Sequence, residues 1–243
     1  MREIDGDELT ATSTERFVRW QMRPARVTRA WVAAGATIVE HASERWDVPP
    51  GSRAFTCLGE AEPLVALMRD LASAIEPPDR LSVPVEVADA SPWRQDESWL
   101  WRWMYADRPG PEPRVEVVEC SDPDEINAVL DAGNPDAWAR PGGEGLRWLG
   151  IRDGDALVAV GAVHRQAGGA GLLQAVTVVP GARGRGLGRD LSAGLTRLAQ
   201  SEAPGVATLG AYADNAPAVA TYLSLGYANP YTFRSGPVSP APG

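Results

Sequence analysis

The sequence contains no lysine, so all 23 of its basic residues are arginines. Cysteine is also scarce: Cys57 and Cys120 stand far apart, neither belongs to a CxxC pair, and we expect both to be reduced. The longest apolar run, residues 156–163, is far shorter than the roughly 18 residues that cross a bilayer. The N-terminus, MREIDGDELT, is acidic and polar, unlike a signal or transit peptide. We therefore expect a soluble, cytoplasmic protein with no membrane partner.

Positive charge is in deficit overall, since the net charge is −9. Proteins that bind nucleic acid usually carry a basic surface, so this balance argues against such a partner. A hydrophobic fraction of 44% is enough for packed cores, and 243 residues can form one large domain or two small ones. No metal site is predicted.

The clearest break in the chain is the segment ADRPGPEP, residues 106–113. Three prolines and a glycine within eight residues cannot sustain a helix or a central strand. We predict an N-terminal accessory domain over residues 1–107, a linker over 108–113 and a second domain over 114–243.

The second domain has a clear alternation of patterns. Ser121 and Asp122 are good N-caps for a helix that ends near Leu130. The predicted strands are residues 114–120, 147–153, 156–166, 172–179, 206–213 and 227–234, and two further helices are predicted over 187–200 and 217–225. Hairpins followed by alternating strands and helices predict an α+β fold, a mixed α/β sheet flanked by helices.

The N-terminal half has a weaker pattern. A helical region is predicted over residues 8–32, then strands over 52–58, 81–87 and 98–105 with a helix over 63–74. Because this order echoes that of the second half, we predict a degenerate copy of the same fold. Trp99, Trp101, Trp103 and Tyr105 alternate along the last strand, which favours a packing surface between the halves over an acceptor pocket wall.

The most informative segment is Arg183-Gly184-Arg185-Gly186-Leu187-Gly188, between a strand and a helix. Glycine adopts positive φ without strain and lets the backbone approach a ligand. Successive N–H groups and the helix N-terminus then favour a diphosphate. The Lys-Ser/Thr of a Walker A loop and the third glycine of a dinucleotide fingerprint are both missing. A plain glycine-rich turn is the remaining alternative.

With this segment the sequence resembles the GCN5-related N-acetyltransferase (GNAT) superfamily. Its signature Arg/Gln-x-x-Gly-x-Gly/Ala matches Arg183, Gly186 and Gly188. Further along, the family often has an asparagine, an aromatic residue seven positions later and then Gly-Phe or Gly-Tyr. The matching residues are Asn215, Tyr222, Gly226 and Tyr227.

The resemblance implies the GNAT acyl-CoA N-acyltransferase fold, here in tandem with the degenerate N-terminal copy. It implies acetyl-CoA as co-substrate and a primary amine of a small molecule or peptide as acceptor. The residues implied in binding acetyl-CoA are Val176, Thr177, Val178, Arg183, Gly184, Arg185, Gly186, Leu187, Gly188, Arg189 and Asn215. The number of subunits, a monomer or a homodimer, stays open.

Tyr222 matches the tyrosine that protonates the leaving thiolate in the family, and we favour that role over packing alone. The general base is not identified. Many relatives have a glutamate on the strand before the loop, where this chain offers Gln174 and Thr177, neither of which accepts a proton near neutral pH. His164 is a candidate because an unperturbed histidine titrates near neutral pH, but its apolar strand face favours a structural histidine. A non-catalytic acyl-CoA sensor is therefore the alternative function.

Overall fold

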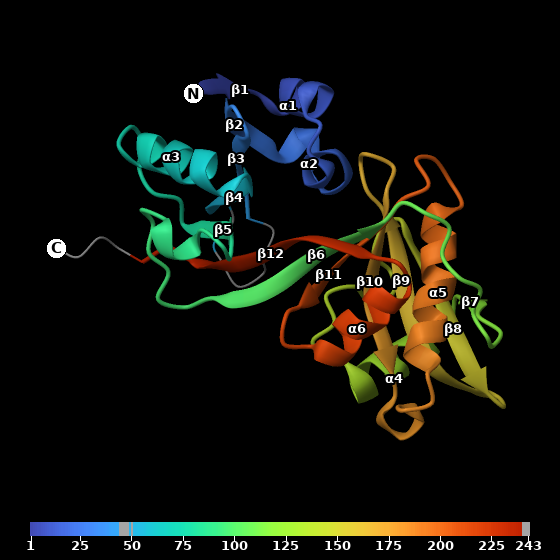
Figure 1. Cartoon of the computed structure of the whole chain (residues 1–243). Helices are drawn as coiled ribbons and strands as arrows, with labels where there is room; N and C mark the ends of the chain where they lie inside the picture. Colours follow the sequence, from blue (N-terminus) through green and yellow to red (C-terminus); the bar gives the residue numbers. More distant parts are fainter. Residues whose placement is uncertain (44–48, 50, 240–243) are drawn as a thin grey trace. The chain divides into compact units, whose positions relative to one another are not determined.

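The computed structural model describes residues 1–43, 49 and 51–239 (Figure 1). These residues form two compact units, of which unit 1 is Met1–Arg102 with Tyr212–Asp214 and the C-terminal segment from Tyr231. Unit 2 is Trp103–Ala211 with Asn215–Pro230. The units thus divide between Arg102 and Trp103, ahead of the predicted linker over 108–113. Residues 240–243, part of the domain predicted over 114–243, lie outside the described residues.

Unit 1 is a mixed sheet with one long helix. Its strands lie in the order β1-β2-β3-β4-β5-β12, antiparallel except for the parallel pair β4 and β5. The last strand of the chain, β12, pairs with β5 through Phe233–Pro237 and is followed by β6 in the strand order. Its elements are β1 (Arg2–Ile4), α1 (Gly6–Thr12), α2 (Arg16–Gln21), η1 (Pro24–Arg26), β2 (Val27–Ala33), β3 (Ala36–Ala42), β4 (Arg53–Gly59), α3 (Ala61–Ala72), β5 (Arg80–Pro84), η2 (Ala88–Ala90) and parts of β6 (Trp99–Ala106) and β12 (Ala228–Pro237).

The helical region predicted over residues 8–32 is wrong in its second half. Two short helices, α1 and α2, are followed by the strand β2. Separate caps explain the division, because Asp5 accepts from the N–H of Glu8 and Glu15 accepts from the N–H of Phe17. Pro24 then opens a single 3-10 turn before β2.

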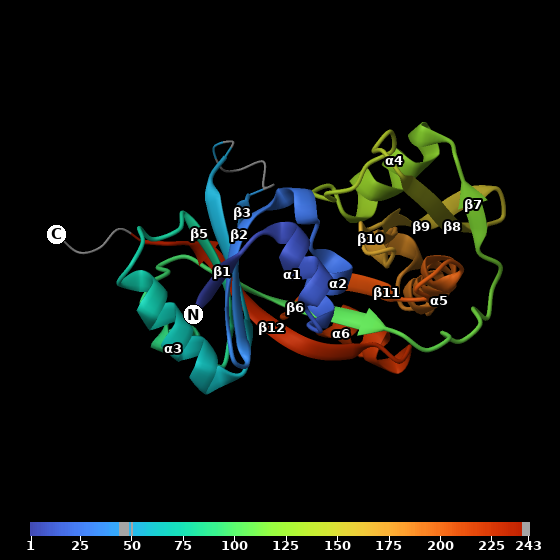
Figure 2. The same cartoon turned by 90° about the horizontal axis from the view of Figure 1, so that it is seen from above.

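Unit 2 is built around the strands β11-β10-β9-β8-β7, antiparallel except for the parallel pair β10 and β11. Figure 2 shows α4 and α5 on opposite faces of these strands. Its elements are the rest of β6 and β12, β7 (Val118–Cys120), α4 (Pro123–Gly133), β8 (Leu146–Asp153), β9 (Ala156–Arg165), β10 (Gly171–Val178), η3 (Pro180–Ala182), α5 (Leu187–Gln200), β11 (Ala207–Tyr212) and α6 (Ala216–Ser224).

The helices of unit 2 form where the sequence spaces its apolar residues and caps. Leu187, Leu191 and Leu195 recur every four residues along α5 and lie in the core beneath it. On the other face, α4 packs Ile126, Val129 and Leu130 against β8 and β9, and the Asp122 carboxylate caps its first turn. The predicted mixed α/β sheet with flanking helices is confirmed, and the tandem copy stays a prediction.

The aromatic alternation of β6 is divided between the units. Within unit 1, Trp101 stacks on Phe233 with ring centres 5.0 Å apart, and its indole N–H donates to Ser235. Within unit 2, the Trp103 and Tyr105 rings lie 5.7 Å apart and are buried. These residues therefore serve the core of the unit to which each belongs.

Candidate functional site

The second half of β10 extends beyond its pairing with β11. The two strands pair in parallel only over Gly171–Leu173 and Ala207–Leu209, whereas β10 continues to Val178 beside β9. A bulge interrupts the register with β9 between Gln174 and Thr177, and Ala175 there has φ 53°. Positive φ is uncommon for a residue other than glycine, so the bulge marks a place held in shape by its surroundings.

The three residues of this strand that are predicted to bind acetyl-CoA, Val176, Thr177 and Val178, differ in the exposure of their side chains. Val176 and Val178 are half-buried, whereas Thr177 is only 3% exposed. The Thr177 hydroxyl donates to the carbonyl of Ala175 at 2.9 Å, and its methyl group packs against Gly133. Its side chain is thus engaged inside the protein, which leaves the backbone of this segment as the part available to a ligand.

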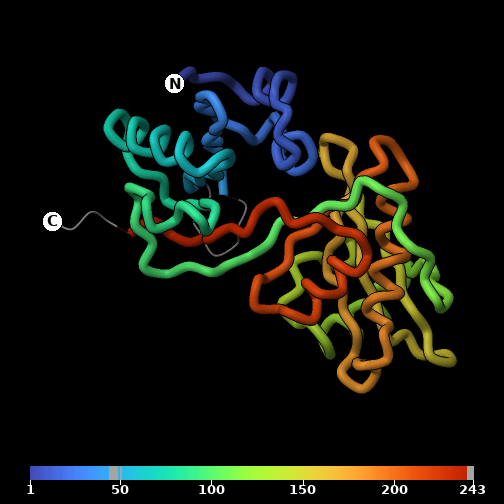
Figure 3. The backbone as a smooth tube through the Cα atoms, viewed as in Figure 1, coloured from blue at the N-terminus to red at the C-terminus, as the bar shows by residue number. Residues whose placement is uncertain are grey.

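The loop from β10 to α5 carries two glycines in the left-handed region, and Figure 3 allows the chain to be followed through it. Gly184 has φ 77° and Gly186, the N-cap of α5, has φ 81°. No side chain caps this helix, which leaves N–H groups of its first turn for another acceptor. Gly188 differs, because a Cβ there would lie at an ordinary 3.7 Å from Val178, so the position accommodates alanine.

The arginines of the loop mostly have protein partners. Arg183 donates through Nε to the carbonyl of Val178 at 3.1 Å and through Nη2 to that of Gly133 at 2.9 Å. Arg185 pairs with Asp153 at 2.6 Å. Arg183 therefore ties the loop to the ends of β10 and α4, and it acts on the loop's shape as well as on its charge.

One contact of the loop region was missed by the sequence reasoning. Asp190, in the first turn of α5, is 1% exposed. Arg114 binds it with both Nε, at 3.0 Å to Oδ1, and Nη2, at 3.1 Å to Oδ2. Burial acts to raise the pKa of Asp190, but the hydrogen bonds and charge of Arg114 hold it below its ordinary value. No local pattern joins residues so far apart along the chain.

The downstream motif lies on α6. The Asn215 side chain accepts from the N–H of Ala218 at 3.2 Å and so caps the helix. Tyr222 is 8% exposed, packs edge-on against Tyr227 with ring centres 5.7 Å apart, and has the Ser192 side chain of α5 near its hydroxyl group. Burial raises the pKa of Tyr222 to about 12.

Ser192 connects Tyr222 with the glycine loop. It stands four residues after Gly188 on α5, a rise of about 6 Å along the helix axis. The Tyr222 hydroxyl therefore meets α5 about one turn beyond the loop. The structure thus brings the two motifs to the same end of the same helix.

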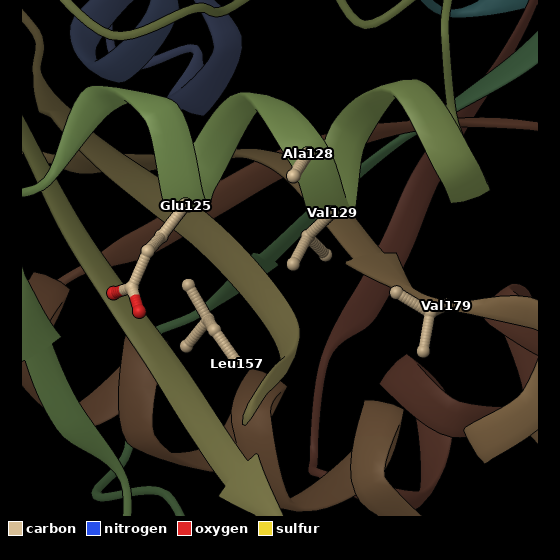
Figure 4. A pocket seen from close by; sticks show the side chains of 5 residues that line it. All are labelled: Glu125, Ala128, Val129, Leu157 and Val179. Atoms are coloured by element: carbon tan, nitrogen blue, oxygen red, sulfur yellow. The ribbon is translucent and has the colours of Figure 1, made fainter. Parts of the chain in front are cut away.

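A separate shallow hollow of about 310 Å³ lies between α4 and the sheet. Figure 4 shows Glu125 and Val129 of α4 facing Leu157, with Val179 beside them. The Glu125 carboxylate binds Arg152 at 2.5 Å, and the rest of the lining is apolar. The hollow offers no donor for a phosphate and contains none of the predicted site residues.

In the part of the chain that the structure describes, no group of three or more His, Cys, Asp and Glu residues is arranged to hold a metal ion. No helix among those residues is both long and apolar enough to cross a membrane. Cys57 is a free, buried thiol, and burial raises its pKa.

Over residues 89–227, more than half of its length, the chain matches the Acetyltransferase (GNAT) family. The chain belongs to this family. GNAT enzymes use acetyl-CoA as co-substrate, and membership therefore supports acyl transfer in general. No curated protein sequence matches the chain.

Solved structures of the GNAT family share the fold. A GCN5-related N-acetyltransferase from Kribbella flavida is 15% identical with a TM-score of 0.54, over 97% of this chain and 96% of that one. An acetyltransferase from the GNAT family from Colwellia psychrerythraea is 9% identical with a TM-score of 0.55, over 98% of this chain and 99% of that one. At such low identity the likeness concerns the fold alone.

The predicted family and fold are confirmed. The GNAT signature residues Arg183, Gly186 and Gly188 lie at the junction of β10 and α5. The individual roles of the site residues stay predictions.

Proposed function

We propose that this chain is an N-acetyltransferase that transfers the acetyl group of acetyl-CoA to a primary amine of a small molecule or peptide. The junction of β10 and α5 carries the proposal. There, β10 continues beyond its parallel pairing with β11 and leads into a loop with two glycines in the left-handed region. The loop is followed by α5, whose N-terminus has no side-chain cap.

The donor would bind along this junction. The pantetheine amides would pair with the backbone of Val176–Val178, along the edge of β10 that does not pair with β11. The diphosphate would accept from the N–H groups of residues 184–188, beside Arg185 and Arg189. Asn215, whose Oδ1 already caps α6, would contribute its amide N–H group.

In the reaction, the amine nitrogen would form a bond to the thioester carbon, and the carbon–sulfur bond would break. A backbone N–H near Val176 or Val178 would stabilise the negative charge that develops on the carbonyl oxygen. Positioning of the two substrates would supply much of the remaining acceleration. The nitrogen sheds its proton to water, and the leaving sulfur gains one.

Tyr222 would donate a hydrogen bond to the leaving sulfur. Its raised pKa keeps the phenol protonated at neutral pH, so the O–H group is available as a donor. A phenol with a pKa of about 12 gives up its proton less readily than a thiol of about 8.5. Tyr222 is therefore better suited to donating a hydrogen bond as the sulfur departs than to transferring its proton completely beforehand.

The experiment is an amine screen with release of free CoA thiol as readout, alongside calorimetric titration with CoA. Turnover with any amine class, together with saturable CoA binding, would support the proposal. Absence of CoA binding would refute it.

One observation favours a second candidate, a sensor that binds acyl-CoA without turnover. Residues 174–178 of β10 contain no carboxylate, and Thr177 is buried and hydrogen-bonded. A base would then have to come from elsewhere or from water. Tight CoA binding without thiol release across a broad amine panel would select the sensor over the enzyme.

A further inference from the structure

Arg114 lies outside both sequence motifs, in the segment between β6 and β7. Its backbone N–H donates to Oδ1 of Asp190 at 3.2 Å, in addition to the two bonds from its guanidinium group. Three bonds to one buried carboxylate fix the side chain, which is otherwise 60% exposed. The guanidinium group is thus held rigidly while remaining open to solvent.

The fixed guanidinium lies directly against the loop. Its Nη2 atom occupies the space that a Cβ on Gly186 would take, with Cζ at 3.6 Å and Nη1 at 4.0 Å from that position. Gly186 is the N-cap of α5, so the cation stands beside the positive end of the helix dipole. Two positive features side by side are unfavourable unless an anion lies between or beside them.

Asp190 provides part of that negative charge. Around the junction stand four guanidinium groups, those of Arg114, Arg183, Arg185 and Arg189, and the carboxylates bound to them are Asp153 and Asp190. The cluster therefore holds a surplus of positive charge in a chain whose net charge is −9. A ligand with two negative charges would balance it.

We propose that Arg114 is a further donor-binding residue, which contacts the diphosphate of acetyl-CoA, and that Asp190 is a positioning residue that aims it. This inference rests on the proposed function. Guanidinium groups bind phosphate oxygens with strong, directional hydrogen bonds. Arg114 would thus add a side-chain clamp to the backbone N–H groups of the loop.

The first test measures CoA affinity by calorimetry in Arg114→Gln. Loss of a charge-assisted bond is expected to weaken binding about tenfold, and Arg114→Lys, which keeps the charge but loses the fork, should fall in between. Arg197→Gln is the matched control, because Arg197 pairs with Glu112 at 2.8 Å and so joins α5 to the same segment away from the loop. The control should stay within about twofold of the unaltered chain.

Dephospho-CoA distinguishes a contact of Arg114 with the diphosphate from a contact with the 3′-phosphate. It lacks the 3′-phosphate, so a contact to the diphosphate predicts the same loss for CoA and dephospho-CoA in Arg114→Gln. A loss confined to CoA would overturn the assignment to the diphosphate. Affinity equal to that of the unaltered chain would overturn the inference and leave the proposed function standing, whereas failure of the unaltered chain to bind CoA would remove the proposed function itself.

A second comparison excludes an indirect effect. Arg114→Gln leaves the buried Asp190 charge uncompensated, which could repel the diphosphate without any direct contact. The comparison of Asp190→Asn with Arg114→Gln/Asp190→Asn removes that charge from both proteins, while the asparagine keeps an Oδ1 that accepts from the N–H and Nε of Arg114 and so still aims the side chain. The double variant is expected to bind CoA at least fivefold more weakly, roughly one lost polar contact. Equal affinities would show that Arg114 only neutralises Asp190, and the inference would fail.

Discussion

The two units contain comparable junctions between a strand and a helix, and these junctions differ in loop length, in the conformation of their glycines and in charge. In unit 1, β4 pairs with β5 in parallel over Ala54–Thr56, and Glu60 alone separates it from α3. Gly59, with φ 122°, lies so close to Gly35 that a Cβ would collide with its carbonyl oxygen. Glu60 and Glu62 place negative charge at the start of the helix.

In unit 2 the corresponding parallel pair is β10 and β11, and residues 179–186 separate β10 from α5. A Cβ at Gly184 would meet open space, and arginines surround the loop. Both units share the strand–helix frame, so the frame alone cannot account for the diphosphate site proposed for unit 2. The longer loop, its left-handed glycines and its positive charge are what distinguish unit 2.

The order strand, helix, three antiparallel strands, helix and parallel strand occurs in both units, if the additional helix α2 of unit 1 is set aside. This agreement supports the proposal of a tandem fold with a degenerate N-terminal copy.

The largest expected effect concerns Tyr222, which lies beside the junction helix α5 of unit 2. Tyr222→Phe should lower kcat about 100-fold, because it removes the hydrogen-bond donor to the leaving sulfur. The KM for acetyl-CoA should change by no more than about twofold, since the donor is bound elsewhere. Steady-state kinetics with thiol detection measures both. An unchanged kcat at every pH would remove Tyr222 from the mechanism.

Gly59→Ala should destabilise unit 1. The added Cβ meets backbone at positive φ, and we expect the free energy of unfolding to fall by about 2 kcal/mol. Chemical denaturation measures this change. Gly51→Ala is the control, because Gly51 also has positive φ but open space around it. Equal losses in the two variants would contradict the tight junction described for unit 1.

Gly186→Ala should instead weaken CoA binding, by about tenfold, since left-handed strain of 1–2 kcal/mol and displacement of Arg114 both distort the loop. Gly188→Ala is the matched control, because its Cβ makes only an ordinary contact. Calorimetric titration of both variants tests the difference. Loss of affinity in both to the same extent would mean that any side chain in this loop blocks the donor.

A smaller effect is expected from the acids of unit 1. Glu60→Gln/Glu62→Gln should leave CoA affinity within about twofold, because Glu60 and Glu62 are exposed and salt screens exposed surface charges. The stoichiometry should remain one CoA per chain in the altered and unaltered proteins. A stoichiometry of two in either would show that the junction of unit 1 also binds the donor.

The smallest effect concerns alkaline pH. Because the pKa of Tyr222 is raised from its ordinary value of 10 to about 12, the phenol keeps its proton as the pH rises from 7 to 10. The pH profile of kcat should therefore show no alkaline decline that Tyr222→Phe abolishes within this range. A decline near pH 10 that disappears in the variant would indicate that the phenol titrates at its ordinary value.

The sequence allowed the local parts of unit 2 to be predicted well. The bounds of α5 were predicted correctly from its spaced leucines and the preceding glycines, and Asp122 was identified as a cap. These features are encoded within a few residues of one another. The strand predicted over 114–120 begins only at Val118, because Arg114 is engaged by a carboxylate on a distant helix.

Features that depend on distant pairing were missed for the same reason. Nothing near Phe233 indicates that the last strand pairs with β5 rather than with its neighbours in sequence. The strand β2 was not predicted from the sequence, because helix-forming residues precede Pro24. The glycine loop could be located from its sequence, whereas the Arg114–Asp190 contact required the fold.

The pairing of Phe233–Pro237 with β5 has a consequence for folding during translation. During synthesis, residues up to Pro84 leave the ribosome long before their partner strand is made. The edge of β5 that pairs with β12 therefore stays unpaired, and open to pairing with other strands, until nearly the whole chain has emerged. Unit 1 therefore cannot be complete before unit 2 has been translated, and cutting the chain at residues 108–113 would deprive the first half of the strand that lies between β5 and β6.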